Sequence, residues 1–259
     1  MIDRALRIVL PVLLFGGLIW FWEWAVGFWQ IKKFVLPAPS AIWQSLVEDD
    51  GTLYTAALVT LRTTAIAFAL AVVSGLSLAA LFASSKLAEA MLAPYTIILQ
   101  VTPVVAIAPL VLVWVKLDNA WLAVLILAWI VAFFPVLANA TAGLKATDNH
   151  LRDLFRLYSA SRWQTFRRLL LPSALPYILA GLKTAGGLAL IGAVVAEFAA
   201  ASGASGGLAW RILESGNRLQ VSKMFAALIL LALMGIAIYL ILSFIEWMLL
   251  RRWHGERAR

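Results

Sequence analysis

Long apolar runs recur along this 259-residue chain and restrict its fold more than any other feature. Each has about 20 residues, the length that an α-helix needs to cross roughly 30 Å of hydrocarbon. Within a bilayer every backbone N–H and C=O must be bonded inside the protein, so only helices and closed β-barrels can span it. Because the alternating apolar and polar pattern of barrel strands is absent, the sequence predicts an all-α membrane protein.

Six spans fit this pattern, and together they form one predicted domain, residues 1–259. They cover about residues 6–29, 53–83, 90–115, 120–144, 176–200 and 224–250. The first span is expected to be retained, because no small-residue cleavage site precedes its tryptophan-rich end. After it, Ser40 is expected to cap a short amphipathic helix. Three glycines predict a tight turn in the loop before the last span: Gly203, Gly206 and Gly207.

Charge is scarce and unevenly placed. Only 13% of the residues are charged, against about 25% in an average soluble domain. The net charge of +8 would favour nucleic acid in a soluble chain, but here it fits the excess of Lys and Arg in cytoplasmic loops. With both termini inside, thirteen Lys and Arg face the cytoplasm and six face outward. We therefore predict N-in and C-in topology, contact with membrane lipid and no nucleic-acid partner.

The chain lacks the parts of an enzyme. With no cysteine and two histidines, it is predicted to hold no disulfide and no metal site. No G-x-x-x-x-G-K-[ST] motif occurs, so it has no P-loop for ATP. It also has no Ser/His/Asp set and no intramembrane pair of carboxylates. We expect a non-catalytic protein with no cofactor of its own.

Residues 145–172 form a polar island between the fourth and fifth spans. Four of its apolar residues recur at i, i+3, i+4 and i+7, as on one face of a helix: Leu151, Leu154, Phe155 and Tyr158. The pattern breaks at residues 159–161. Ser161 and Gln164 have capping-box spacing, which predicts a second short helix over residues 162–168.

Pro172 and Pro176 are expected to stop this second helix and to start the fifth span. The island would then lie across the cytoplasmic mouth of the spans as two short helices. Its apolar face can fill a groove on a partner protein while its arginines orient it, or the pair can rest on anionic lipid. The residues alone leave both alternatives open.

The island resembles the cytoplasmic signature loop of ABC-importer permeases, written E-A-A, three residues, G, nine residues, I-x-L-P. The same spacing places residues 153–155 at E-A-A, Ser159 at the glycine, Leu169 at the isoleucine and Pro172 at the end. Other segments resemble the branch that carries alkanesulfonates, taurine and thiamine-precursor pyrimidines. They are LPAPSAIWQSL at 36–46, FFPVLANATAGLK at 133–145, ASRWQTFRRLLLPSALP at 160–176 and VVAEF at 194–198.

The resemblance implies a type I importer in the bacterial cytoplasmic (inner) membrane. Two copies of the chain would join two P-loop ATPase subunits, which bind ATP and Mg²⁺, and an extracytoplasmic solute-binding protein. Docking is expected over residues 151–168, and the residues assigned to it are Leu151, Asp153, Leu154, Phe155, Tyr158, Ser159, Ala160, Arg162, Trp163, Arg167 and Pro172.

The island departs from the family pattern in two places. Asp153-Leu154-Phe155 is bulkier than E-A-A, and Ser159 replaces a glycine that adopts a left-handed turn at little cost. A serine there is expected to strain the turn by about 1 kcal/mol. The island is therefore expected to fit its ATPase differently, or to serve a divergent ATPase.

A second set of residues is predicted to line the translocation path or its gate: Thr102, Pro103, Pro109, Asn139 and Glu197. Glu197 lies deep in the fifth span, on the helix face that carries small residues at 181, 185, 189 and 193. Its alternative is a structural carboxylate bonded to a neighbouring helix. The prolines predict either a kinked gate or a packing kink. Asn139 is expected to form a hydrogen bond between helices.

Two other classes of function are less well supported. A secondary transporter would need ionisable relays within the spans, and many are built on inverted repeats that are not evident here. A membrane scaffold would use the island to recruit something other than an ATPase. Relatives in the resembling branch carry several solutes, and the sequence does not name the one carried here.

Overall fold

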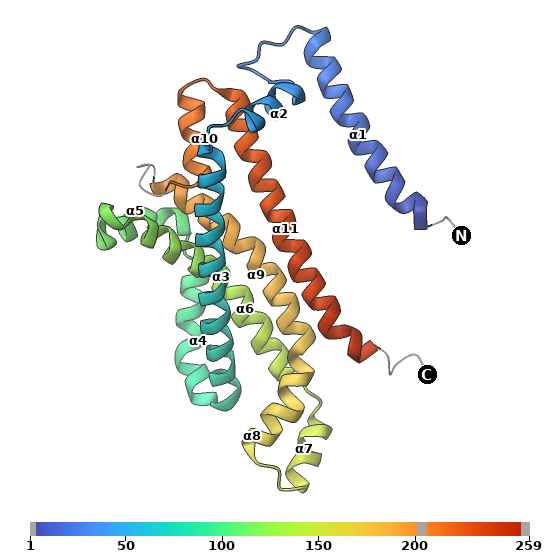
Figure 1. The fold of residues 1–259 in the computed structure, drawn as a ribbon. Helices are drawn as coiled ribbons and strands as arrows, with labels where there is room; N and C mark the ends of the chain where they lie inside the picture. The colour runs from blue at the N-terminus through green and yellow to red at the C-terminus, as the bar shows by residue number, and fades with distance from the viewer. Residues whose placement is uncertain (1–3, 201–205, 255–259) are drawn as a thin grey trace.

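The computed structural model describes residues 4–200 and 206–254, and it contains helices and no strand within these ranges (Figure 1). The helices are α1 (Arg4–Phe28), α2 (Pro39–Val47), α3 (Thr52–Ser84), α4 (Lys86–Val101), α5 (Val104–Val115), the 3₁₀ turn η1 (Leu117–Asn119), α6 (Ala120–Lys145), α7 (Asn149–Leu157), α8 (Arg162–Thr165), the π-helical turn η2 (Phe166–Leu170), α9 (Leu171–Ala200), α10 (Leu208–Asn217) and α11 (Val221–His254).

The predicted spans are confirmed in number and nearly in bounds. Within the described residues, five helices are long and apolar enough to cross a membrane, and the bent pair of α4 and α5 makes a sixth if it counts as one span. α3, α6, α9 and α11 each extend a few residues beyond the predicted limits or match them closely. The all-α membrane architecture thus follows from the apolar runs.

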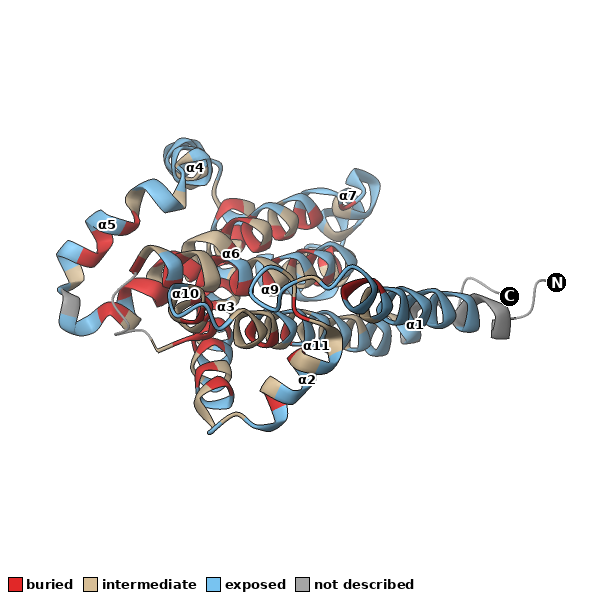
Figure 2. Cartoon of the chain, turned by 90° about the horizontal axis from the view of Figure 1, so that it is seen from above, coloured by how far each residue is buried: buried red, intermediate tan, exposed pale blue. Residues whose placement is uncertain are grey.

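Small residues let the three central helices, α3, α6 and α9, pack closely. The predicted stripe on α9 is buried along its whole length, from Gly181 to Ala193. A Cβ on Gly192 would lie 3.0 Å from the Cα of Ala128 in α6, and one on Gly181 would lie 2.7 Å from the Cβ of Asn139. Such close contacts need glycine at these two positions. Seen from above, buried residues concentrate on these helices, whereas α1 and α4 are largely exposed (Figure 2).

The third predicted span, in which the prolines were expected to produce a kink, is broken into two helices. The chain bends by 101° between α4 and α5, at Thr102 and Pro103. Thr102 is extended, as expected for a residue before proline, and Pro103 has no N–H to continue the ladder of α4. Pro94 and Pro109 lie inside α4 and α5 and do not end them.

The predicted stop at Pro172 is also wrong. α8 passes through η2 into α9 without a break, and both Pro172 and Pro176 lie inside α9. In the π-helical turn the N–H of Leu171 bonds to the C=O of Phe166, five residues back. This wider turn directly precedes Pro172, where a regular helix would lose a hydrogen bond. The end of the island and the fifth span therefore form one continuous helix.

The short helix predicted after the first span is confirmed as α2, but its cap differs from the expectation. Ser40 does not cap α2; the helix begins at Pro39, and the N–H and hydroxyl of Ser40 donate to the Glu23 carboxylate of α1 at 3.0 and 2.7 Å. The loop predicted before the last span contains the helix α10, which directly follows Gly207. Gly206 has a positive φ of 62°, as a tight turn requires, and Gly203 lies outside the described residues.

Candidate functional site

The polar island projects beyond the bundle at the end opposite α2 and α10 (Figure 1). Asp148 caps α7 by accepting a hydrogen bond from the N–H of His150 at 2.9 Å. Arg152 reaches back from α7 and donates through Nη2 to the C=O of Leu144 at 2.7 Å. These contacts fix the start of α7 against the end of α6, so this part of the island has a defined conformation.

The turn between α7 and α8 has the predicted left-handed residue. Ser159 has a φ of 50°, its N–H bonds to the C=O of Arg156 at 2.9 Å, and the N–H of Ala160 bonds to the C=O of Phe155 at 3.0 Å. This pair of bonds is a Schellman motif, in which glycine is the usual residue at the left-handed position. The capping box of Ser161 and Gln164 is also present, with bonds of 2.8 and 3.2 Å.

The island exposes large apolar side chains. Leu157, Tyr158 and Trp163 are 82%, 80% and 65% exposed, and Leu151 and Leu154 are also exposed. A cavity of about 320 Å³ opens between α7 and α8, and it is lined by Leu154, Phe155, Tyr158, Ala160, Gln164 and Arg168. Contiguous exposed apolar surface in a polar segment indicates a binding surface.

The structure brings together only part of the set predicted for docking. Leu154, Phe155, Tyr158 and Ala160 share the cavity just described. Exposed Asp153 pairs with Arg156 at 3.2 Å, and Trp163 stacks on Phe166 with ring centroids 6.0 Å apart. Arg162 lines a different cavity, which faces α3. Arg167 is exposed on η2, and Pro172 is half-buried in the first turn of α9.

Glu197, predicted for the path, is 1% exposed and is fully occupied by contacts inside the chain. Its Oε1 accepts from the hydroxyl of Thr60 in α3 at 2.8 Å, and its Oε2 accepts from the N–H of Ala209 in α10 at 3.0 Å. Gly207 lies directly against this carboxylate. The geometry matches the structural alternative, a carboxylate bonded to neighbouring helices; a role in the path stays a prediction.

The remaining path candidates bond within their own helices. Nδ2 of Asn139 donates to the C=O of Pro135 at 2.8 Å, one turn earlier in α6, so the predicted bond between helices is wrong. The hydroxyl of Thr102 donates to the C=O of Ile98 at 2.7 Å at the end of α4. Pro103 and Pro109 are exposed. The part of these residues in a path or gate stays a prediction.

Comparison with known proteins identifies the family of this chain. Residues 71–254, which include the island and Glu197, match the family described as binding-protein-dependent transport system inner membrane component. The chain belongs to this family. It is therefore a multi-pass permease subunit of a bacterial inner-membrane importer that works with an ATPase and a solute-binding protein.

Three relatives align over most of the permease. A probable ABC transporter permease protein of Haemophilus influenzae is 32% identical over 95% of this chain and 97% of its own. The formylaminopyrimidine transport permease protein of Halalkalibacterium halodurans is 31% identical over 90% and 91%. The putative aliphatic sulfonates transport permease protein of Bacillus subtilis is 30% identical over 86% and 80%.

A solved structure has the same fold. The crystal structure of an amino acid ABC transporter with histidines aligns with a TM-score of 0.64, over 81% of this chain and 97% of that chain. The sequence identity is 19%, so the likeness concerns the fold alone.

Sequence reasoning overlooked an ion pair inside the permease. Nζ of Lys183 in α9 lies 2.7 Å from Oε2 of Glu246 in α11, and 5.2 Å from the ring centre of Tyr239. The signal was present in the sequence, because a lysine within a 30-residue apolar helix needs a partner. The pair fastens α11 to the central bundle.

Proposed function

We propose that two copies of this permease form a path for a small polar solute such as an alkanesulfonate, taurine or a thiamine-precursor pyrimidine. The solute class is supported by the names of two relatives, one for formylaminopyrimidine and one for aliphatic sulfonates. The chain itself is non-catalytic, and ATP and Mg²⁺ bind the ATPase partner. The charge distribution supports N-in and C-in topology, in which the island would lie in the cytoplasm.

The proposal that the island docks the ATPase rests on the exposed apolar face of the island. Leu154 and Tyr158 flank a cavity in a segment that is otherwise polar. Water disfavours such a surface, whereas the groove of a partner can bury it against apolar side chains. Arg168 in the lining of this cavity and exposed Asp153 on α7 add charges that would orient the partner.

The continuous helix from α8 to α9 gives this docking a mechanical consequence. When ATP closes the ATPase dimer, the docked α7 and α8 move with it. Because η2 joins α8 to α9 without a break, that displacement passes into a helix packed on α3 and α6. The central helices then alternate between inward-open and outward-open arrangements, each favoured by a different state of the ATPase.

The test is co-purification of the ATPase with tagged permease from native membranes in mild detergent. Asp153→Arg reverses a charge on the exposed face of α7 and should release the ATPase. Asp118→Arg makes the same change in an exposed residue at the opposite end of α6, and the ATPase should stay bound. Failure of the ATPase to co-purify with the wild-type chain would contradict the proposal, as would equal retention by both variants.

Solute and coupling are tested by uptake. Cells that depend on this permease should accumulate labelled taurine or another solute of the proposed class. The uptake should stop when the gene for the partner ATPase is deleted. Uptake that continues without any ATPase, and follows an ion gradient instead, would point to secondary transport.

A further inference from the structure

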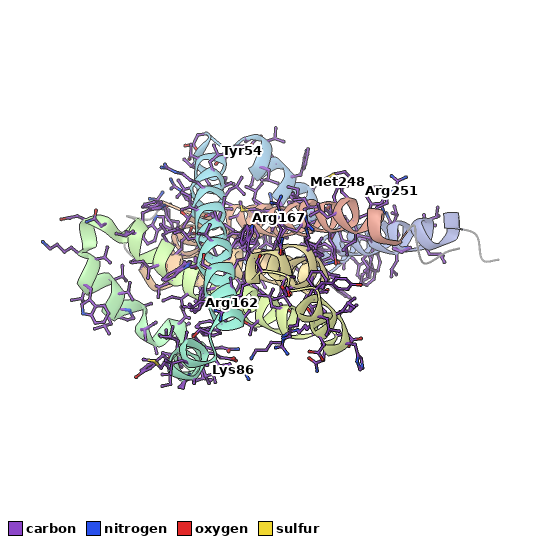
Figure 3. The ribbon with its side chains drawn as sticks, turned by 90° about the horizontal axis from the view of Figure 1, so that it is seen from below. Tyr54, Lys86, Arg162, Arg167, Met248 and Arg251 are labelled. Carbon is purple, nitrogen blue, oxygen red and sulfur yellow. The ribbon has the colours of Figure 1, made fainter. Side chains whose placement is uncertain are left out.

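A second cavity lies on the side of the island that faces the bundle. It has a volume of about 360 Å³ and is bounded by the end of α3, by α7 and by α8 with η2. Its lining residues are Ala80, Ala83, Ser84, Arg152, Arg156, Ala160, Arg162, Thr165, Phe166 and Leu170. Seen from below, Arg162 lies beside the end of α3 (Figure 3). The docking face of the island, around Leu154 and Tyr158, opens into a different cavity.

The lining is strongly basic. It includes three arginines and no carboxylate. Within the described residues, the ion pair recorded for these arginines joins Arg156 to Asp153, and both side chains are largely in solvent, where such pairs contribute little. Arg152 bonds to the C=O of Leu144, while its Nε–H is buried and has no acceptor in the described part of the chain. The positive charge of the cavity is therefore not neutralised by the chain around it.

The length of α3 indicates where the cavity lies relative to the bilayer. This helix has 33 residues and is about 50 Å long, whereas the hydrocarbon core is about 30 Å thick. Its end therefore reaches the headgroup region of the bilayer. The lining combines guanidinium groups with the apolar side chains of Ala80, Ala83 and Leu170. A ligand that fits has an anionic head and an apolar body at the same depth.

We propose that this cavity binds the phosphate group of an anionic phospholipid. Guanidinium groups match the oxygens of phosphate in paired, charge-assisted hydrogen bonds. Basic pockets beside membrane helices on the cytoplasmic side suit lipid headgroups. Free phosphate has a similar charge but no apolar part that could contact Ala80, Ala83 and Leu170. The lining therefore favours a lipid as the ligand. The bound lipid would join the island to α3 independently of the ATPase.

Native mass spectrometry of the intact permease in mild detergent tests the proposal. Titration with phosphatidylglycerol should give one tightly bound lipid per copy of the chain, and phosphatidylcholine should bind at least several-fold more weakly. Arg162→Gln should weaken phosphatidylglycerol binding by about tenfold, as loss of a charged hydrogen bond predicts. Arg251→Gln removes the same charge at the end of α11, away from the cavity, and should change binding less than twofold (Figure 3).

Two further variants test the same cavity. Arg162→Lys retains the charge without the planar fork and should fall between wild type and Arg162→Gln. If Arg162→Gln does not fold, Arg156→Gln takes its place, because Arg156 is largely exposed and lines the same cavity. Equal binding of both lipids, or equal losses in Arg162→Gln and Arg251→Gln, would overturn the site. Binding of inorganic phosphate without binding of the lipid would overturn the lipid assignment.

Discussion

The carboxylate of Glu197 accepts a hydrogen bond from the hydroxyl of Thr60 at 2.8 Å, although 137 residues separate the two in the chain. The same two side chains meet the first turn of α10. The oxygen of Thr60 accepts from the N–H of Leu208 at 2.9 Å, and Glu197 accepts from that of Ala209 at 3.0 Å. The first N–H groups of a helix lack partners within the helix and carry partial positive charge, which a carboxylate stabilises. Glu197 and Thr60 thus fasten α10 to α9 and α3.

Gly207 should be intolerant of any side chain, because a Cβ there would overlap the Glu197 carboxylate. We expect Gly207→Ala to destabilise the permease by about 2 kcal/mol, as overpacking of a filled site does. For a chain of this size this corresponds to a fall in Tm of about 4–8 °C, measured by thermal unfolding in detergent.

Gly187→Ala is the matched control, because a Cβ at this position of α9 meets nothing within 4 Å. It should leave Tm unchanged or raise it, since alanine favours a helix by up to about 1 kcal/mol over glycine. Similar Tm values for the two variants would mean that α10 does not sit on Glu197.

Local chemistry accounts for the parts that could be predicted. The capping box depends on residues three apart, and the left-handed Ser159 depends on the turn that follows α7. The spans depend on runs of adjacent apolar residues. In each case the residues that decide the structure are neighbours in the chain, so their pattern is visible in the sequence.

The errors concern hydrogen-bond partners that are distant in sequence and the course of the backbone at Pro172. Glu23 replaces Ser40 as the cap of α2 from 17 residues away, and no local signal announces it. Pro103 lies at the break between α4 and α5, whereas Pro172 directly follows a π-helical turn and lies within a continuous helix. Proline lowers the probability of a regular helix without fixing the outcome.

Replacing Ser159 by glycine should stabilise the island. The left-handed conformation costs a residue with a Cβ about 1–2 kcal/mol, and glycine avoids this cost. We expect hydrogen exchange of amides in α7 and α8 to slow by about fivefold in Ser159→Gly, which is the factor that corresponds to 1 kcal/mol.

The opposite change is expected for Ser161→Ala. This variant removes the hydroxyl that accepts from the N–H of Gln164, and loss of such a cap costs about 1 kcal/mol. Exchange of the α8 amides should become faster. Faster exchange in Ser159→Gly as well would show that the serine makes a contact that outweighs its backbone strain.

Asp49, which lies just before the start of α3, should make stability depend on acid pH. Burial alone would raise the pKa of this carboxyl, but hydrogen bonds from the N–H of Leu53, from Lys223 and from the hydroxyl of Thr52, with the charge of Lys223, hold its pKa below the ordinary value. A lowered folded-state pKa adds stability above the unfolded-state pKa of about 3.9, and this stability is lost as the pH falls through the folded-state pKa.

Asp49→Asn should therefore lower Tm at neutral pH. The Tm difference from wild type should narrow below about pH 4, where the carboxyl of the unfolded chain gains its proton, and should vanish only below the lower folded-state pKa. Asp50→Asn is the control, because Asp50 is mostly exposed and lies 3.7 Å from the same lysine. An exposed pair contributes less than about 1 kcal/mol, so its Tm should follow wild type at every pH. A gap for Asp49→Asn that stays constant down to pH 3 would contradict the lowered pKa.

The bend between α4 and α5 can be measured as a distance between two spin labels. The chain has no cysteine, so Met91→Cys and Val113→Cys, both exposed, give unique attachment points. With a bend of 101°, their backbones should lie about 20 Å apart, whereas a straight helix would separate them by about 33 Å. Diluting labelled chains with unlabelled ones suppresses distances between two copies.

Leu228→Cys with Leu249→Cys provides the control, since both residues are exposed on the unbroken helix α11 and should lie about 32 Å apart. A distance near 33 Å for the pair on α4 and α5 would show one continuous span.

The same labels address the role of Thr102 and Pro103. If the bend belongs to a gate, the distance should change when the ATPase partner binds ATP, because the ATPase states favour different arrangements of the permease. A distance that is the same in every state identifies a fixed packing kink.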